Sequence, residues 1–323
     1  MRVASPRRAV VTAIASLAPL LLAVACSTSS SSTASIKPEK ADITVGATPT
    51  EGNVALYLAL SRGIFAAHGL HVKIVIVQST PVIVPSMESG QIDVAAGQIA
   101  GLLAAQAQGR AFKVLAAGLE LKPDVNEIVT LKSSGITSLA GLKGKTILVN
   151  APIGDDPLLT DAALATVGIK PAQVRYLTVA FPAMSAALTF QKSGAAYCTQ
   201  PFCEEIVQQD SAVILADLDQ GPARGLLTSG YTATAAWAKK YPRTAAAFSA
   251  AIVAASRLAD ANPALVRKTV GARLAMPARV TSAMPIGTFP AEVTAAKLRQ
   301  VENLMLRSGQ LTRPVDVTSL LTP

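Results

Sequence analysis

The sequence predicts an α/β protein in which two doubly wound domains, joined by two crossover segments, enclose a ligand cleft. Residues 43–77 follow the order strand, polar loop, helix, tight turn and strand, and residues 146–179 repeat that order. The chain has 323 residues, of which 50% are hydrophobic, and this is enough to fill two cores. A parallel strand-helix-strand unit places its first loop at the carboxyl edge of the sheet, where open sheets bind ligands.

The first unit shows the pattern most clearly. Apolar residues alternate with polar residues or glycine over 43–47, and the apolar run over 72–76 predicts a buried second strand. We expect the helix between them to begin after Thr50, whose side chain can cap it, and to end near Gly63 and Gly69.

Three polar loops of the first half follow strands directly. They cover residues 48–53, 78–80 and 97–98, and each leads into a predicted helix. Exposed amides and the helix dipole at such a position favour a negative or strongly accepting group. One such loop alone would be an ordinary helix cap, but three at one sheet edge indicate a binding site.

The second half repeats the arrangement. A strand over 146–149 leads through the loop 150–156 to Pro157, which suits the first helical turn with Asp156 as its cap. We expect the chain to cross between domains near Val129 and Leu227. Residues 42–129 and 227–323 would then form the first domain and 130–226 the second, and such a pair can close around a ligand.

The amino terminus predicts export. Arginines precede an apolar run over residues 10–25, and Ala23 to Cys26 resembles a bacterial lipobox, so we expect residues 1–25 to be removed and Cys26 to carry lipid. Arg7 and Arg8 leave both the general secretory and the twin-arginine routes open. The apolar run is short for a transmembrane anchor. Residues 26–41 are polar and predict a flexible tether, with the body outside the cytoplasm.

The charge of the chain does not indicate a nucleic-acid partner. The formal net charge is +9, and removal of Arg2, Arg7 and Arg8 with the leader gives 9 − 3 = +6. Basic residues are scattered and aromatic residues make up only 4% of the chain, whereas a nucleic-acid reader gathers both on one surface.

The residues that could carry catalysis or bind metal are few. His68 and His71 are the only histidines, and they flank a turn without nearby cysteines or a carboxylate cluster, so we expect no metal site, no catalytic triad and no cofactor. Cys198 and Cys203 remain once Cys26 is lipidated, and exported chains usually pair such cysteines. Two free buried thiols are the alternative, because the short spacing can misplace the β-carbons.

Five segments, taken in order, resemble one protein family. They read TVGATPTEGNVALYLALSRGIFAAHGLHV, ESGQIDVAAG, SLAGLKGKTILVN, AFPAMSAALTFQKSGAAYCTQPF and LMLRSGQLTRPVDVTSLL. The chain resembles the NMT1/THI5-like solute-binding proteins of the sulfonate, taurine, nitrate and thiamine-pyrimidine group, which have the type II periplasmic-binding-protein fold and feed ABC importers. By position, this resemblance implies a ligand set of Thr48, Thr50, Asn53, Ser79, Gln98, Asn150, Gly154, Phe181 and Gln200. Gln200 stands where the family commonly has an acidic residue.

The resemblance implies a monomeric lipoprotein on the outer face of the bacterial cytoplasmic membrane. It would capture a small organic solute by domain closure and present it to an ABC permease, without being an enzyme. The alternatives are an enzyme of the pyrimidine-synthase kind on the same fold and a ligand-sensing lipoprotein that does not transport.

The charge of the solute stays open. The predicted loops hold no arginine or lysine, so an anion would depend on amides and helix dipoles. Glu51, Asp155 and Asp156 lie nearby and could meet an amine or an aminopyrimidine, although helix capping is the simpler role for these acids. Both sulfonate-like anions and nitrogen heterocycles therefore remain candidates.

Overall fold

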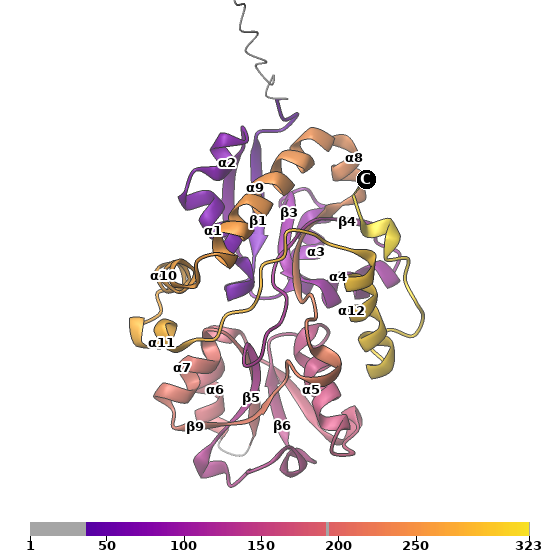
Figure 1. The fold of residues 1–323 in the computed structure, drawn as a ribbon. Coiled ribbons are helices and arrows are strands. Elements are labelled where there is room, and N and C mark those ends of the chain that lie inside the picture. Colours follow the sequence, from indigo (N-terminus) through magenta and orange to yellow (C-terminus); the bar gives the residue numbers. More distant parts are fainter. Residues whose placement is uncertain (1–36, 192–193, 323) are drawn as a thin grey trace, which may run out of the picture. The chain divides into compact units, whose positions relative to one another are not determined.

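The computed structural model describes residues 37–191 and 194–322, which belong to one compact unit (Figure 1). The predicted leader over residues 1–25, the lipidation site Cys26 and most of the predicted tether lie outside the described residues. In the described part of the chain, no helix has both the length and the apolar character to cross a membrane.

The unit contains two five-stranded mixed sheets of the same design. The first sheet has the spatial order β2 (His71–Ile76), β1 (Asp42–Ala47), β3 (Val94–Gln98), β10 (Ser229–Thr234), β4 (Phe112–Ala117). The second has the order β7 (Arg175–Thr178), β6 (Thr146–Val149), β8 (Ala195–Thr199), β5 (Asn126–Leu131), β9 (Ala212–Asp217). In each sheet three neighbouring strands are parallel and the fourth, β10 or β5, is antiparallel to both of its neighbours.

Helices cover both sheets (Figure 1). Those that follow the first sheet's strands are α1 (Val54–Ser61), α2 (Ile64–Ala67), α3 (Thr80–Glu88), α4 (Ile99–Ala107) and α8 (Ala235–Lys240). Those of the second sheet are α5 (Asp155–Ala165), α6 (Met184–Gln191) and α7 (Phe202–Gln209), and the carboxyl-terminal helices are α9 (Pro242–Asp260), α10 (Pro263–Leu274), α11 (Ala278–Ala283) and α12 (Ala295–Ser308). We call each sheet with its covering helices a lobe, and the carboxyl-terminal helices belong to the first lobe.

In the core of the first lobe, the strand β1 is buried and the long helix α9 packs on α1, α2 and β4. Ile43 and Val45 of β1 are fully buried, as alternation predicts, and Phe65 stacks on Phe248 of α9 with ring centroids 5.3 Å apart. The expectation of a buried second strand is wrong: β2 is the edge of the sheet, and Ile76 remains 44% exposed. An apolar run in the sequence does not reveal whether a strand is central or at an edge.

The two lobes are joined where the crossings pair with each other. β5 enters the second sheet directly after β4 leaves the first, and β10 returns after β9. The Leu121 amide donates to the Leu226 carbonyl at 2.9 Å, and Glu120 also pairs with Thr288. The outward crossing therefore ends before Asn126, and the boundary expected near Val129 falls inside β5.

Candidate functional site

A small cavity of about 40 Å³ lies between the sheet edges of the two lobes. Its lining residues from the first lobe and the crossings are Thr48, Thr50, Gly52, Gly97, Gln98, Leu119, Thr228 and Ser229, and those from the second lobe are Asn126, Asn150, Asp155, Phe181, Tyr197 and Thr199. Larger grooves of about 590 and 910 Å³ lie on the first lobe alone. Only the small cavity receives residues from both sheets among these three, so we take it as the candidate site.

The loop after β1 is held by its own hydrogen bonds. Asn53 donates from Nδ2 to the Thr48 carbonyl at 2.7 Å, and the Thr50 amide donates to the same carbonyl at 2.9 Å. Thr50 occupies the N-cap position of the turn η1 (Glu51–Asn53), but its side chain makes no capping hydrogen bond, contrary to expectation. Thr48 and Thr50 line the cavity, whereas Asn53 is 2% exposed and shapes the loop from behind.

The loop after β6 is organised by Asp156. Its Oδ2 accepts the Asn150 amide at 2.5 Å, and its Oδ1 accepts Nε2 of Gln98 from the first lobe at 2.8 Å. Asp156 was expected to cap α5, but Gly154 holds the N-cap position and Asp156 lies within the first turn. Burial raises the pKa of Asp156 to about 6, and the hydrogen bonds from Gln98 and Asn150 oppose that rise.

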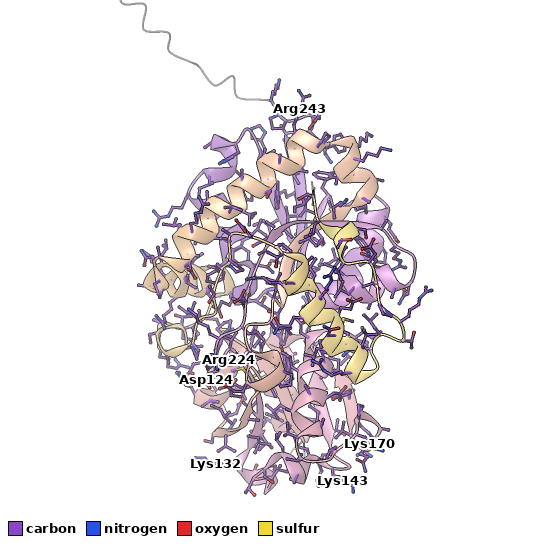
Figure 2. All side chains as sticks on the ribbon, turned by 45° about the vertical axis from the view of Figure 1, so that its right-hand side comes forward. Asp124, Lys132, Lys143, Lys170, Arg224 and Arg243 are labelled. Atoms are coloured by element: carbon purple, nitrogen blue, oxygen red, sulfur yellow. A yellow bond between two sulfur atoms is a disulfide. The ribbon has the colours of Figure 1, made fainter. Side chains whose placement is uncertain are left out.

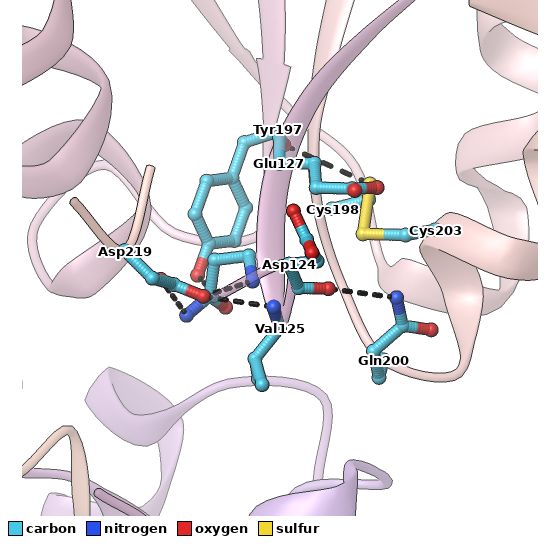
Figure 3. The surroundings of a disulfide bond; sticks show 9 residues. Asp124, Val125, Glu127, Tyr197, Cys198, Gln200, Cys203 and Asp219 are labelled. Atoms are coloured by element: carbon cyan, nitrogen blue, oxygen red, sulfur yellow. Dashed lines mark hydrogen bonds between the residues drawn. A yellow bond between two sulfur atoms is a disulfide. The ribbon is translucent and has the colours of Figure 1, made fainter. Parts of the chain in front are cut away.

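The loop after β8 is fixed by a disulfide between Cys198 and Cys203, which confirms the predicted pairing (Figure 3). Gln200 lies inside this loop and donates from Nε2 to the Asp124 carbonyl at 3.1 Å. Its own carbonyl accepts the Glu51 amide of the first lobe at 3.4 Å. Gln200 is 1% exposed and does not line the cavity, so it joins the lobes at their contact.

An aromatic wall and a hydrogen-bonded network complete the second-lobe side. The Phe181 ring stacks on Phe202 with centroids 5.5 Å apart. The Tyr197 hydroxyl donates to Oδ1 of Asn126 at 2.7 Å, and Nδ2 of Asn126 donates to Asp219 at 3.0 Å (Figure 3). These contacts leave Tyr197 and Asn126 with one fixed orientation at the cavity.

Comparisons with known proteins agree with this architecture. The family model described as NMT1/THI5 like matches residues 52–265. The chain belongs to the NMT1/THI5-like family. A search of curated protein sequences finds no significant match.

Several solved structures share the fold of this NMT1/THI5-like protein. The alkanesulfonate-binding protein SsuA from Xanthomonas axonopodis pv. citri, bound to MOPS, has a TM-score of 0.74 at 18% identity, covering 88% of this chain and 99% of that chain. The periplasmic nitrate-binding protein NrtA from Synechocystis PCC 6803 has a TM-score of 0.74 at 15% identity, covering 88% and 87%. The desulfurization enzyme DszB has a TM-score of 0.64 at 16% identity, covering 88% and 97%. The predicted family is confirmed, and so is the predicted α/β fold with two sheets.

In this NMT1/THI5-like protein, five of the nine residues expected to bind ligand line the cavity: Thr48, Thr50, Gln98, Asn150 and Phe181. Asn53 and Gln200 support the loops from behind. Ser79 starts α3 beside the edge strand β2 and is not among the lining residues, because the edge position carries that loop away from the centre of the sheet.

Gly154 lies where the two lobes meet. Its φ of 137° is a conformation that glycine adopts readily, and a β-carbon there would lie 2.3 Å from Oε1 of Gln98. Its amide donates to Oε1 of Gln310 at 3.2 Å, and its carbonyl accepts Nε2 of Gln310 at 3.2 Å. Gly154 therefore permits close approach of the lobes rather than lining the cavity.

Sequence reasoning missed several lining residues, among them Asn126, Tyr197, Thr199, Thr228 and Ser229. Tyr197 lies in the middle of β8, and the others lie at the ends of β5, β8 and β10 or directly beside those ends. The two predicted crossings between the domains could have pointed to β5 and β10, because a strand that follows a crossing begins at the cleft. To predict which of their residues line the cavity also requires the antiparallel register of these strands, which no local sequence pattern supplies.

Four buried side-chain atoms in or beside the cavity have no hydrogen-bond partner in the described protein. They are Asn150 Nδ2 and Asp155 Oδ1 of the lining, and Glu51 Oε2 and Gln200 Oε1 next to it. Burial raises the pKa of Glu51 to about 8, opposed by the Gly287 amide. Burial and then the neighbouring Asp156 raise the pKa of Asp155 well above its usual value, and the Ala100 amide opposes them.

The two histidines lie away from the cavity. His71 is exposed and contacts Asp42 at 3.2 Å, and His68 contacts the Ile64 carbonyl at 2.9 Å. The one group of possible metal ligands found among the described residues is Glu127 with Cys198 and Cys203, whose sulfur atoms are joined in the disulfide. The site is therefore one of hydroxyl, amide, carboxyl and aromatic groups, suited to recognising a solute.

Proposed function

We propose that this NMT1/THI5-like protein is the extracytoplasmic solute receptor of an ABC importer. It binds a small organic solute between its lobes and presents the closed form to a membrane permease. The observation that carries this proposal is the cavity itself, because its walls come from both sheets and a ligand there contacts both lobes at once. A ligand shifts a closing equilibrium only by its difference in affinity for the two states, and contacts with both lobes supply that difference.

The same proposal covers the remaining features of the chain. Residues 1–25 act as a cleaved leader, Cys26 carries the lipid, and the monomeric body is tethered to the outer face of a bacterial cytoplasmic membrane. In this proposal each lobe is a domain, and the pairing of β5 from Asn126 onward supports an outward crossing before that residue. The structural neighbours described as alkanesulfonate-binding and nitrate-binding proteins support a role in solute capture.

The size of the cavity supports a small ligand. By the same measure a cavity of roughly 10–15 Å³ holds one water. At about 40 Å³ the closed site has room for a few heavy atoms, and a larger solute requires the lobes to move apart.

The test combines identification with binding. The body, residues 37–323, is purified without reductant, denatured, and its released solutes are identified by mass spectrometry. A thermal-shift panel of nitrate, methanesulfonate, MOPS, 4-aminopyrimidine and cytosine follows, with small-angle scattering of each positive mixture. We expect one class to raise the melting temperature and reduce the radius of gyration, since a ligand at about 100 times its Kd stabilises by about 2.7 kcal/mol. A body that carries no solute and responds to no class contradicts the proposal.

An enzyme on the same fold is the second candidate, because the neighbour DszB is one. In the described part of the chain, none of the cavity-lining residues is a cysteine, histidine or lysine, so a nucleophile there would have to be a threonine, serine or tyrosine hydroxyl or the Asp155 carboxylate. Chromatography of each stabilising compound after overnight incubation decides between the two: intact compound favours the receptor, and conversion favours the enzyme.

A further inference from the structure

A further groove of the first lobe, of about 460 Å³, lies between α1 and α10, which pack against each other (Figure 1). Its lining residues are Tyr57, Leu60, Ser61 and Arg62 from α1 and its carboxyl end, and Leu265, Lys268, Thr269, Ala272 and Arg273 from α10. The groove shares no lining residue with the cavity between the sheets. Small-molecule sites usually measure about 300–1,000 Å³, so this groove has room for a ligand.

Every charged residue that lines this groove is basic. Arg62, Lys268 and Arg273 carry positive charge, and no aspartate or glutamate is among the lining residues. The stretches of sequence that carry the two helices, residues 52–87 and 261–291, contain no acid either. Positive charges that line one concave surface without a carboxylate raise the local concentration of anions.

These three cations have no charge partner within the protein. In the described part of the chain, the side chains of Arg62 and Lys268 make no hydrogen bond or ion pair. The Arg273 guanidinium has only a ring contact, with its Cζ 5.2 Å from the centroid of Tyr57. Helix dipoles favour cations at carboxyl ends, which accounts for Arg62 and Arg273, whereas Lys268 lies in the middle of α10. The donors of all three side chains are therefore available to a ligand.

Basic residues elsewhere are arranged differently. Figure 2 shows Lys132, Lys143 and Lys170 at the outer end of the second lobe, where they line none of the grooves named above. It shows Arg243 at the opposite end of the unit, where this side chain pairs with Glu39 at 3.0 Å. The groove of about 590 Å³ has two aspartates beside its lysines. The groove between α1 and α10 thus differs in combining concave shape with unpaired cations.

The charge and the donors of this groove suit a phosphate ester. A phosphate monoester carries a charge of about −1.5 to −2 at pH 7 and three strongly accepting oxygens. Arginine binds phosphate through two parallel N–H donors, and lysine adds a compact positive charge. The cation–π contact with Tyr57 restricts Arg273 without occupying its N–H groups, which reduces the entropy lost on binding.

The remainder of the lining favours an organic ligand over a bare ion. Leu60 is 39% exposed, and Leu265 and Ala272 also contribute apolar surface to the groove. The Ser61 and Thr269 hydroxyls can donate to ligand oxygens. An organic group attached to the phosphate would cover part of the apolar surface, which inorganic phosphate cannot do.

We infer that the groove between α1 and α10 is a second binding site, which takes a phosphate ester with an organic body. Arg62, Lys268 and Arg273 hold the phosphate, and Leu60 and Leu265 contact the organic body. A soluble phosphorylated metabolite and a phospholipid headgroup share this chemistry. The site goes beyond the proposed receptor function and does not depend on the solute in the cleft.

Binding measurements on the body, residues 37–323, test the inference at about 150 mM salt, where distant surface charges are screened. Calorimetry uses glycerol 3-phosphate and phenyl phosphate as soluble probes, with glycerol and phenol as their controls. Sedimentation with phosphatidylglycerol vesicles, compared with phosphatidylcholine vesicles, tests the lipid source. We expect at least one phosphorylated probe to bind about tenfold or more tightly than its control, because charge-assisted hydrogen bonds form only with the phosphate.

Substitutions in and beside the groove separate a built site from general attraction of anions. Arg273→Gln should weaken the bound probe by about tenfold, because it removes a charged donor pair. Lys268→Gln is the second variant in case the first does not fold, and it should weaken the probe in the same direction. Arg279→Gln is the matched control: this exposed arginine belongs to the same acid-free stretch and does not line the groove, so affinity should not change.

The outcomes also distinguish the two sources of the phosphate. Binding of a soluble ester that depends on Arg273 supports the inference and identifies a metabolite. Retention on phosphatidylglycerol vesicles that depends on Arg273 supports it and identifies a lipid headgroup. Absence of both overturns the inference, and so does an equal loss of binding in Arg279→Gln and Arg273→Gln. Neither result affects the receptor function, because no residue of the cavity is changed.

Discussion

The two lobes have the same sheet topology, but the polar groups on their two walls of the cleft differ in their hydrogen-bond partners. In the first-lobe wall, the loop after β1 is held by an internal hydrogen bond from the Asn53 side chain to the Thr48 carbonyl. The second-lobe wall, formed by the loop after β6, presents Asn150 and Asp155, the two lining residues with unpartnered buried atoms. The first wall is thus a preformed surface, and the second presents buried polar atoms without protein partners.

The contact between the walls shows the same asymmetry. Gln98, at the end of β3 in the first lobe, donates to Asp156 and accepts the Asp155 amide, and Gln310, which follows α12, bonds to Gly154. Both side chains end on the first residues of α5 and the glycine before it. The contacts between the lobes therefore meet at one short segment, and under the proposed receptor function changes there test the comparison most directly.

Gly154→Ala should have the largest effect. The residue would be forced into a disfavoured backbone conformation, which costs about 1–3 kcal/mol, and its β-carbon would overlap Gln98. We expect the lobes to stay apart and solute affinity to fall at least tenfold. Small-angle scattering with saturating ligand measures the separation of the lobes, and calorimetry measures the solute affinity. Gly141→Ala, at an exposed position, is the control, and equal affinity of the two variants would contradict this role for Gly154.

Asp219→Ala should destabilise the second lobe at the start of β5. The Asp219 carboxyl accepts the Val125 and Asn126 amides at 2.8 Å and the Asn126 side chain at 3.0 Å, all at the start of β5. Loss of these buried bonds should lower the free energy of unfolding by about 3 kcal/mol. Urea denaturation measures it, with Asp42→Ala as a surface control expected to change it by less than about 0.5 kcal/mol.

Glu51→Gln examines the buried acid of the first lobe, whose Oε1 accepts the Gly287 amide at 3.0 Å and whose Oε2 has no partner. The folded pKa of Glu51 is raised from 4.5 to about 8, so its contribution to stability is fully present below about pH 4.5 and is lost as the pH rises toward 8. Asp219, raised to about 7, and Asp156, raised to about 6, act with the same sign.

The variant should match the wild type near pH 4.5 and exceed it by about 1.5 kcal/mol at pH 8. Melting temperatures of both proteins from about pH 4.5 to pH 8 test this difference in stability. Parallel curves for the two proteins would show that the Glu51 carboxyl does not carry the dependence.

Gln310→Ala should have the smallest effect. It removes two hydrogen bonds of 3.2 Å between a half-buried side chain and Gly154, and each such bond is worth about 0.5–1.5 kcal/mol at most. We expect the ligand-free form to open slightly and the affinity to fall by about threefold. Scattering without ligand should register an increased radius of gyration, whereas an unchanged radius would show that the contacts of Gln98 and Gln200 hold the lobes together without Gln310.

Much of this protein is readable from local patterns. Alternation over 43–47 and the apolar run over 146–149 predicted strands that the structure contains, because side-chain period depends only on neighbours along the chain. The cysteine count predicted the disulfide between Cys198 and Cys203. The family resemblance implied a ligand set, of which Thr48, Thr50, Gln98, Asn150 and Phe181 line the cavity.

The remainder depended on three-dimensional packing. The sequence by itself determined two α/β units, their strands and the sheet edge where a site could form, since these follow from periodicity and loop position. Only the tertiary structure decided that β2 is an edge strand, which moves Ser79 aside, and that β5 and β10 bring Asn126 and Ser229 to the cavity. It also decided which amides are already bonded and which buried atoms are not, because hydrogen-bond satisfaction depends on partners distant along the chain.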